Sequence, residues 1–118
     1  MNKNNIFKEL DHDLLDGYLQ SLGNDIIKKM FALYCQQVVI YLNDIENSMA
    51  SEHAQQWQEA CHKMKGAAGS VGLKALHSRL KLMEKTSADN SDKQAQLVEL
   101  KVHNTQAIAE FESWLAQC

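Results

Sequence analysis

His62 is the residue of this sequence whose surroundings most clearly suggest chemistry. It begins the run His-Lys-Met-Lys-Gly-Ala-Ala-Gly-Ser-Val-Gly-Leu, in which Gly66 and Gly69 follow one and two helical turns after the imidazole. A glycine inside a helix costs on the order of 1 kcal/mol relative to alanine, so both glycines need a compensating reason. A neutral imidazole is also a competent nucleophile at about neutral pH. We therefore predict that the missing side chains leave His62 open to a large partner.

Helical periodicity places His62 beside the apolar side of its helix and not within it. The apolar side consists of Trp57, Cys61, Met64, Ala68 and Val71. His62 lies about 100° round the helix from this seam, on the rim or outer face. Glu84 follows the apolar Met83 in the next helix, and an antiparallel arrangement brings it level with His62. Its carboxylate is predicted either to accept the imidazole N–H, which fixes the tautomer, or to be an ordinary exposed glutamate.

The elements that position these residues are predicted to be helices throughout. The sequence has no proline and only five glycines, so it lacks the usual punctuation of β-hairpins. Apolar residues recur at three- and four-residue steps, and the predicted helices cover residues 12–22, 25–49, 53–70, 73–87 and 92–117. Gly72 is predicted to take a positive φ in the turn between the third and fourth helices. The pattern predicts an all-α, antiparallel up-and-down four-helix bundle with a short extra N-terminal helix across one end.

Composition restricts the partners and the compartment. The chain has 118 residues, of which 45% are hydrophobic, so we expect a single domain over 1–118. A net charge of −3, with Lys and Arg scattered among the acids, argues against nucleic acid as a partner. Three cysteines without CxxC spacing fit a reducing cytosol. The sequence has no cationic leader and no apolar run of about 18 residues, so we expect a cytoplasmic protein without direct membrane contact.

Three apolar residues of the second helix fall outside its main apolar stripe. They are Ile26, Leu33 and Ile40. Such residues either form a docking patch, here near the histidine, or flank the core.

A further set of residues resembles a known family. The set is His62, Lys65, Gly66, Gly72, Leu76, Leu80 and Glu84. Its residue types and spacing resemble the histidine-containing phosphotransfer (HPt) domain of bacterial two-component phosphorelays. The run from Lys65 to Leu73 is most similar to the C-terminal HPt domain of ArcB-type hybrid sensor histidine kinases. The family fold is the same four-helix bundle, and the resemblance covers most of the chain, with the last helix matching in pattern only.

The resemblance implies roles for the residues near the histidine. His62 would accept a phosphoryl group from the aspartate of a receiver domain and pass it to the aspartate of another receiver. Lys65 would stabilise phosphoryl oxygens, and Lys63 would lie at the docking surface, although either lysine is otherwise an ordinary solvated helix residue. Gly66 would clear space for the active-site loops of the receiver, unless it only allows two helices to pack closely; the family pattern does not require Gly69.

The resemblance also implies partners and cofactors. The partners are response-regulator receiver domains, which supply the aspartate, Mg²⁺ and a lysine, so the HPt domain itself needs no cofactor and no metal. The sequence contains no glycine-rich phosphate loop, so we expect a phosphoryl carrier and not an ATP-using kinase. We expect a monomer, either free-standing or as the C-terminal domain of an inner-membrane sensor kinase.

Two alternatives stay open at this point. The first is an HPt-like adaptor that binds a receiver domain without phosphotransfer. The second is a zinc or dicarboxylate hydrolase built in a helical bundle. The remaining histidines show no HxxxH or HExxH spacing, so its metal site would have to be assembled across helices; they are His12, His53, His77 and His103.

Overall fold

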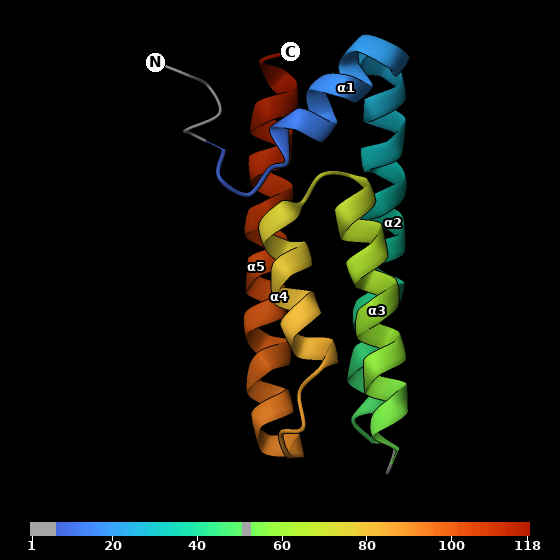
Figure 1. Cartoon of the computed structure of the whole chain (residues 1–118), viewed down its shortest axis with the longest axis vertical. Coiled ribbons are helices and arrows are strands. Elements are labelled where there is room, and N and C mark those ends of the chain that lie inside the picture. The colour runs from blue at the N-terminus through green and yellow to red at the C-terminus, as the bar shows by residue number, and fades with distance from the viewer. Residues whose placement is uncertain (1–6, 51–52) are drawn as a thin grey trace.

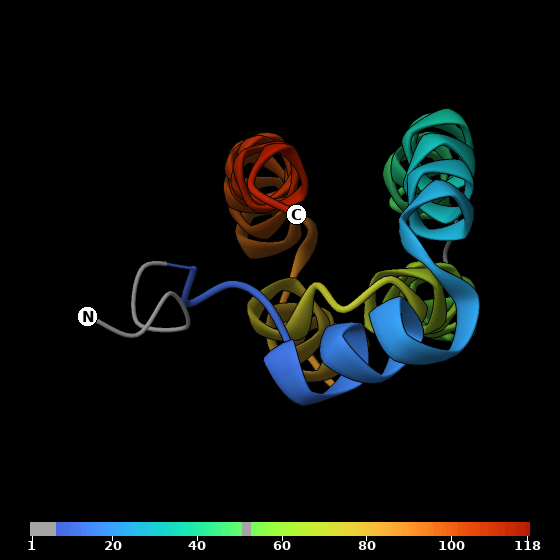
Figure 2. The same cartoon turned by 90° about the horizontal axis from the view of Figure 1, so that it is seen from above.

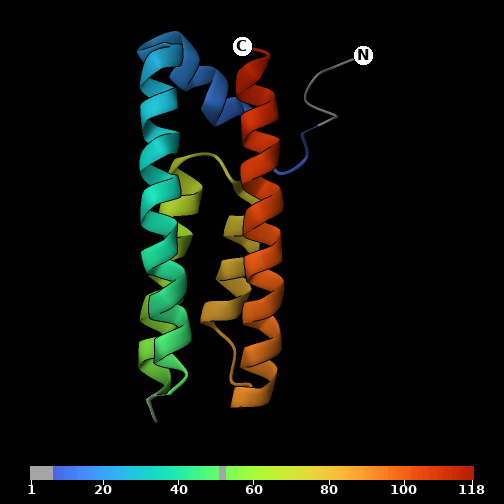
Figure 3. The same cartoon turned by 180° about the vertical axis from the view of Figure 1, so that it is seen from behind.

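Helices make up almost all of the described chain, which in this computed structural model is residues 7–50 and 53–118 (Figure 1). The helices are α1 (His12–Leu22), α2 (Asn24–Ser48), α3 (Ala54–Ser70), α4 (Lys74–Glu84) and α5 (Asn90–Ala116). α2, α3, α4 and α5 run alternately up and down, and α1 crosses one end of the bundle, as the view from above shows (Figure 2). Seen from behind, α2 and α5 lie in front of α3 and α4 (Figure 3). The predicted all-α bundle with an extra N-terminal helix is confirmed.

The loop between α4 and α5 is where the predicted helix bounds fail. The fourth helix was expected to reach residue 87, but it ends at Glu84, and the N–H of Lys85 bonds back to the carbonyls of Leu82 and Met83. α5 begins at Asn90, two residues earlier than expected, because the Asp89 side chain accepts the N–H of Asp92 and caps the helix. Because Asp89 caps the helix, α5 begins within the segment that was predicted to be a loop.

Aromatic side chains are part of the buried core between the helices. The rings of Phe31 and Phe111 stack with centroids 4.3 Å apart, and Trp114 packs edge-on against Phe111 at 5.3 Å. Trp57 of α3 is fully buried, and its indole N–H donates to the backbone oxygen of Met83 at 2.7 Å. This hydrogen bond joins α3 to the last turn of α4, because burial of an indole N–H requires an acceptor.

The turn between α3 and α4 depends on Gly72. Its φ is 82°, which confirms the predicted positive value. A Cβ at this position would lie 2.9 Å from the side chain of Leu15 in α1, so glycine is required for space as well as for conformation. The carbonyl of Gly72 accepts the N–H of Asp11 at 2.9 Å, and Leu10 forms a β-bridge with Leu73. The segment before α1 is thereby attached to this turn.

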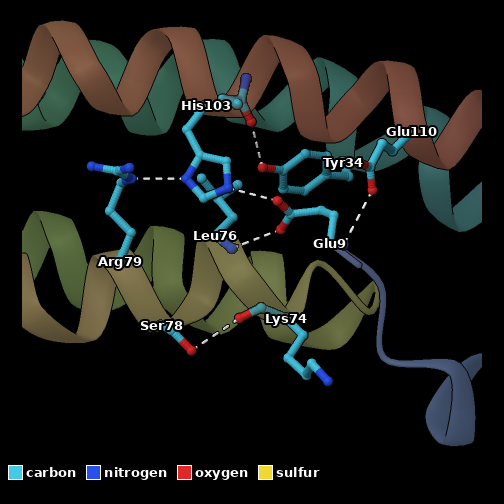
Figure 4. Close-up of polar contacts among 9 residues, drawn as sticks. Glu9, Tyr34, Lys74, Leu76, Ser78, Arg79, His103 and Glu110 are labelled. Atoms are coloured by element: carbon cyan, nitrogen blue, oxygen red, sulfur yellow. Dashed lines mark hydrogen bonds and ion pairs between the residues drawn. The ribbon is translucent and has the colours of Figure 1, made fainter. Parts of the chain in front are cut away.

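Glu9 extends this attachment to α4 and α5 (Figure 4). α4 has no side-chain cap of its own, and Glu9, 7% exposed, supplies one from a distant part of the chain. Its Oε2 accepts the N–H of Leu76 at 2.7 Å, and its backbone oxygen accepts the N–H of Ala75. Its Oε1 lies 2.6 Å from Nε2 of His103 in α5. A carboxylate at a helix N-terminus satisfies free N–H groups and interacts favourably with the helix dipole.

Candidate functional site

His62 lies on the solvent side of α3, as its position beside the apolar seam predicted. Its side chain is 71% exposed, whereas the neighbouring Cys61 and Met64 are fully buried. Burial, with a smaller contribution from Glu84, raises the pKa of Cys61 to about 12. The thiol beneath His62 therefore stays protonated near neutral pH and does not compete as a nucleophile.

Glu84 lies beside His62, as the antiparallel pairing of α3 and α4 predicted. Nδ1 of His62 is 3.2 Å from Oε2 of Glu84, which is the last residue of α4 and is 14% exposed. A carboxylate only accepts hydrogen bonds, so Nδ1 carries a proton, and in the neutral ring Nε2 keeps its lone pair. The contact thus selects the tautomer whose outer nitrogen is free to act as a nucleophile.

Lys65 is bound to the same carboxylate, which sequence reasoning did not foresee. Its Nζ donates to Oε1 of Glu84 at 2.7 Å, and the lysine side chain is only 18% exposed. This hydrogen bond is the largest cause that holds the pKa of the Glu84 carboxyl below its ordinary value; His62 acts in the same direction and burial opposes both. Glu84 therefore remains a carboxylate, and the cation expected to face phosphoryl oxygens is used to hold it.

The two glycines after His62 have different surroundings. A Cβ on Gly66 would have no atom within 4 Å apart from its own helix, so the surface one turn beyond His62 is open. A Cβ on Gly69 would lie 3.0 Å from Cδ2 of His77 in α4. Close packing of α3 against α4 therefore accounts for Gly69, and the open approach predicted for both glycines holds for Gly66 alone.

A cleft of about 410 Å³ contains His62 and opens between α3 and the end of α4. Its lining residues are Gln58, Glu59, His62, Lys63, Glu84 and Lys85. Lys63 and Lys85 are exposed; Lys63 lies on α3, and Lys85 directly follows the last residue of α4. Gln58, Glu59 and Lys85 were not among the predicted residues. The signal that could have found Lys85 is its position one residue after Glu84 at the predicted level of His62.

The residues around His62 match a known family over most of the chain. The model of the Hpt domain matches residues 29–116. The chain belongs to the Hpt domain family. It is a histidine phosphotransfer module of the phosphorelay type, and Hpt domains are phosphoryl carriers and not kinases.

Relatives of this Hpt domain include two sensor proteins and one solved structure. The aerobic respiration control sensor protein ArcB of Escherichia coli O157:H7 is 36% identical over 67 residues, which are 57% of this chain and 9% of that protein. The ArcB protein of Escherichia coli strain K12 is 34% identical over the same coverage. The histidine-containing phosphotransfer domain of Escherichia coli ArcB superposes with a TM-score of 0.83 and 24% identity over 98% of both chains. The chain thus spans about a tenth of the length of the ArcB proteins, and the solved structure supports its fold.

Of the three apolar residues predicted to form a docking patch on α2, only Leu33 lines a groove. Leu33 lines a groove of about 210 Å³ between α2 and α3. The other lining residues are Met30, Tyr34, Gln37, Tyr41, Ala67, Ser70 and Val71. Ile26 and Ile40 are exposed on α2 but do not line this groove. Because Ala67 follows Gly66 directly, the groove begins beside the open surface of α3.

Within residues 7–50 and 53–118, no group of three or more His, Cys, Asp or Glu side chains could hold a metal ion. In the same ranges, no helix is long and apolar enough to cross a membrane.

Proposed function

We propose that Nε2 of His62 accepts a phosphoryl group from the aspartyl phosphate of a response-regulator receiver domain and passes it to the aspartate of another receiver. The observation that carries this proposal is the contact between Nδ1 of His62 and Glu84, in a side chain that is 71% exposed. The Nδ1–H donates to Glu84, and in the neutral ring the lone pair of Nε2 is available to a donor from solution.

The chemical step follows from this tautomer. The Nε2 lone pair forms a bond to phosphorus while the phosphorus–oxygen bond of the donor breaks, and the donor aspartate leaves as a carboxylate. The imidazole ring gains a positive charge, and its Nδ1 proton stays on the ring and donates to Glu84. The hydrogen bond then links two charged groups, which makes it stronger. Transfer to the next aspartate is the reverse of this step, and no proton has to leave Nε2.

Phosphoryl transfer depends mainly on positioning and on charge stabilisation. Mg²⁺ and a lysine would come with the receiver, so the Hpt domain needs neither. Gly66 leaves the approach to His62 open, and the groove beside Leu33 offers apolar surface two turns further along the bundle. We infer that a receiver covers both, with Lys63 at the edge of its contact. Ile26 would lie at the far edge of the same face.

The larger protein and its compartment also belong to this proposal. The similarity to ArcB supports a module of a larger sensor protein, because the matched residues are a small fraction of those proteins. We infer that this module lies on the cytoplasmic side of a membrane sensor kinase. As a carrier, the isolated domain should take no label from ATP alone. We further expect it to act as a monomer without direct membrane contact.

Transfer from a radiolabelled, phosphorylated receiver in the presence of Mg²⁺ tests the proposal. Wild type should gain label that is labile in acid and stable in base, as phosphohistidine is, and His62→Gln should gain none. His77→Gln is the matched control, because His77 is a partly exposed histidine on the neighbouring helix and should leave the label unchanged. A receiver that binds wild type without labelling it would contradict phosphotransfer and support the adaptor alternative.

A further inference from the structure

The phosphoryl group on His62 needs a cation that the motif lysine does not provide. A phosphorylated histidine carries a group with a charge between −1 and −2 near neutral pH. The Nζ atom of Lys65 already lies 2.7 Å from Glu84, and its side chain is largely covered. Phosphorylation also leaves Glu84 in place as a carboxylate on the other side of the ring. A different cation at the surface is therefore better placed than Lys65 to pair with the new negative charge.

Two lysines without such a partner border the same cleft as His62. Within the described part of the chain, the amino groups of Lys63 and Lys85 make no hydrogen bond or ion pair. Lys63 also borders a second groove, whose lining adds the carboxylate of Asp44 to that of Glu59, which lines both. Lys85 borders the His62 cleft directly after Glu84.

The end of α4 strengthens the case for Lys85. Lys85 is the C-cap residue of α4, so the unpaired carbonyls and the negative end of the helix dipole lie at this side of the cleft. An anion placed there without a counter-charge is disfavoured. A lysine at a helix C-terminus offsets this field, and its flexible stem lets the ammonium reach across a shallow opening.

We propose that Lys85 contacts the phosphoryl group carried by Nε2 of His62. This inference rests on the proposed phosphorylation of His62. It assigns the stabilisation of phosphohistidine to the C-cap residue of α4, and it leaves Lys65 to hold the Glu84 carboxylate.

The test uses phosphoramidate as the donor, because this small molecule has no protein surface that could contact Lys85. Nε2 attacks its phosphorus, the phosphorus–nitrogen bond breaks and ammonia leaves. Lys85→Gln is compared with Lys81→Gln, an exposed lysine one turn earlier on α4 that does not border the cleft. Phosphorus NMR follows the rate of phosphorylation and the pH midpoint at which the phosphoryl group titrates.

Lys85→Gln should slow phosphorylation about two- to fivefold, since an exposed charge pair has this strength. The pH midpoint of the phosphoryl group should rise by about the base-ten logarithm of the same factor. The difference should shrink at high salt, which screens exposed charges. Lys81→Gln should match wild type in both measurements. Equal behaviour of Lys85→Gln and wild type overturns the inference, as does a defect seen only with a receiver donor, which would place Lys85 in docking. Wild type that accepts phosphoryl from phosphoramidate but from no receiver would instead count against the proposed function.

Discussion

Two clusters of this Hpt domain contain the same three kinds of group, a histidine, a carboxylate and a cation. In the first, His62, Glu84 and Lys65 join α3 to the end of α4. In the second, Glu9 and His103 join the N-terminal segment to α5, and Arg79 of α4 donates to His103 (Figure 4). The histidine side chain is 71% exposed in the first cluster and 16% exposed in the second. Residue types alone therefore do not separate a reactive histidine from a structural one.

The hydrogen bonds of the two rings make the difference. Arg79 only donates, so Nδ1 of His103 accepts its N–H at 2.8 Å and Nε2 carries the proton towards Glu9. Both nitrogens of His103 are thus occupied. At His62, Nδ1 is occupied and Nε2 is left free, because the cation binds the carboxylate and not the ring. One free nitrogen in an exposed ring allows group transfer, whereas two occupied nitrogens make a structural link.

Replacing each histidine by alanine should separate the two roles most strongly. His62→Ala should lose phosphoryl acceptance completely, while its free energy of unfolding changes by less than about 0.5 kcal/mol, as is usual for an exposed residue. His103→Ala should keep acceptance and lose about 1–3 kcal/mol, because Glu9 and Arg79 lose a partner in a covered site. Receiver labelling and urea unfolding measure the two effects. Label on His62→Ala, or unchanged stability of His103→Ala, would contradict the assignment.

Removing the carboxylate of the second cluster should cost stability without touching the chemistry. Glu9→Ala leaves the N–H of Leu76 and the ring of His103 without acceptors, so we expect a loss of about 2–3 kcal/mol. Amide hydrogen exchange should show the loss of protection first at the start of α4. Glu99→Ala is the control, because Glu99 is an exposed partner of Arg79 in the same cluster and should cost less than about 1 kcal/mol. A similar cost for both variants would mean that Glu9 does not cap α4.

The sequence predicted the first cluster far better than the second. Helical periodicity was enough to place His62 outside the seam and Glu84 level with it, because both positions depend on regular spacing within adjacent helices. Glu9 reaches α4 across 67 positions of the chain, and no local pattern marks a side chain that caps a distant helix. The resemblance assigned Lys65 to phosphate. Its pairing with Glu84 could not be foreseen, because it depends on side-chain conformations that spacing does not determine. The packing at Gly69 was not foreseen for a similar reason, because the position of the His77 ring beside it depends on how α3 and α4 pack.

The carboxylate of the first cluster should make stability depend on acidity. Because the pKa of Glu84 is lower in the folded protein than its ordinary value of 4.5, its contribution is fully present above that value and is lost as the pH falls through the folded pKa. Glu84→Gln has no such group. Urea unfolding over a pH series measures the difference in unfolding free energy between wild type and Glu84→Gln. If the difference stays constant down to the lowest pH at which the protein is folded, folding does not lower the pKa of this carboxyl.

The glycines beside the first cluster should give the smallest effect and the finest distinction. Gly66→Ala adds a methyl group to an open helix surface, so helix propensity should stabilise the protein by about 0.5–1 kcal/mol. Gly69→Ala gains the same propensity but brings Cβ to 3.0 Å from His77, and the required movement should cancel part or all of the gain. Thermal unfolding compares the two variants. If the larger Gly66→Gln also slows transfer from a receiver while phosphoramidate reacts at the wild-type rate, the open surface serves the protein partner, since a small donor needs no such approach. Equal stabilisation by both alanines would instead mean that α3 and α4 have room to spare at Gly69, and packing would no longer explain why that glycine is there.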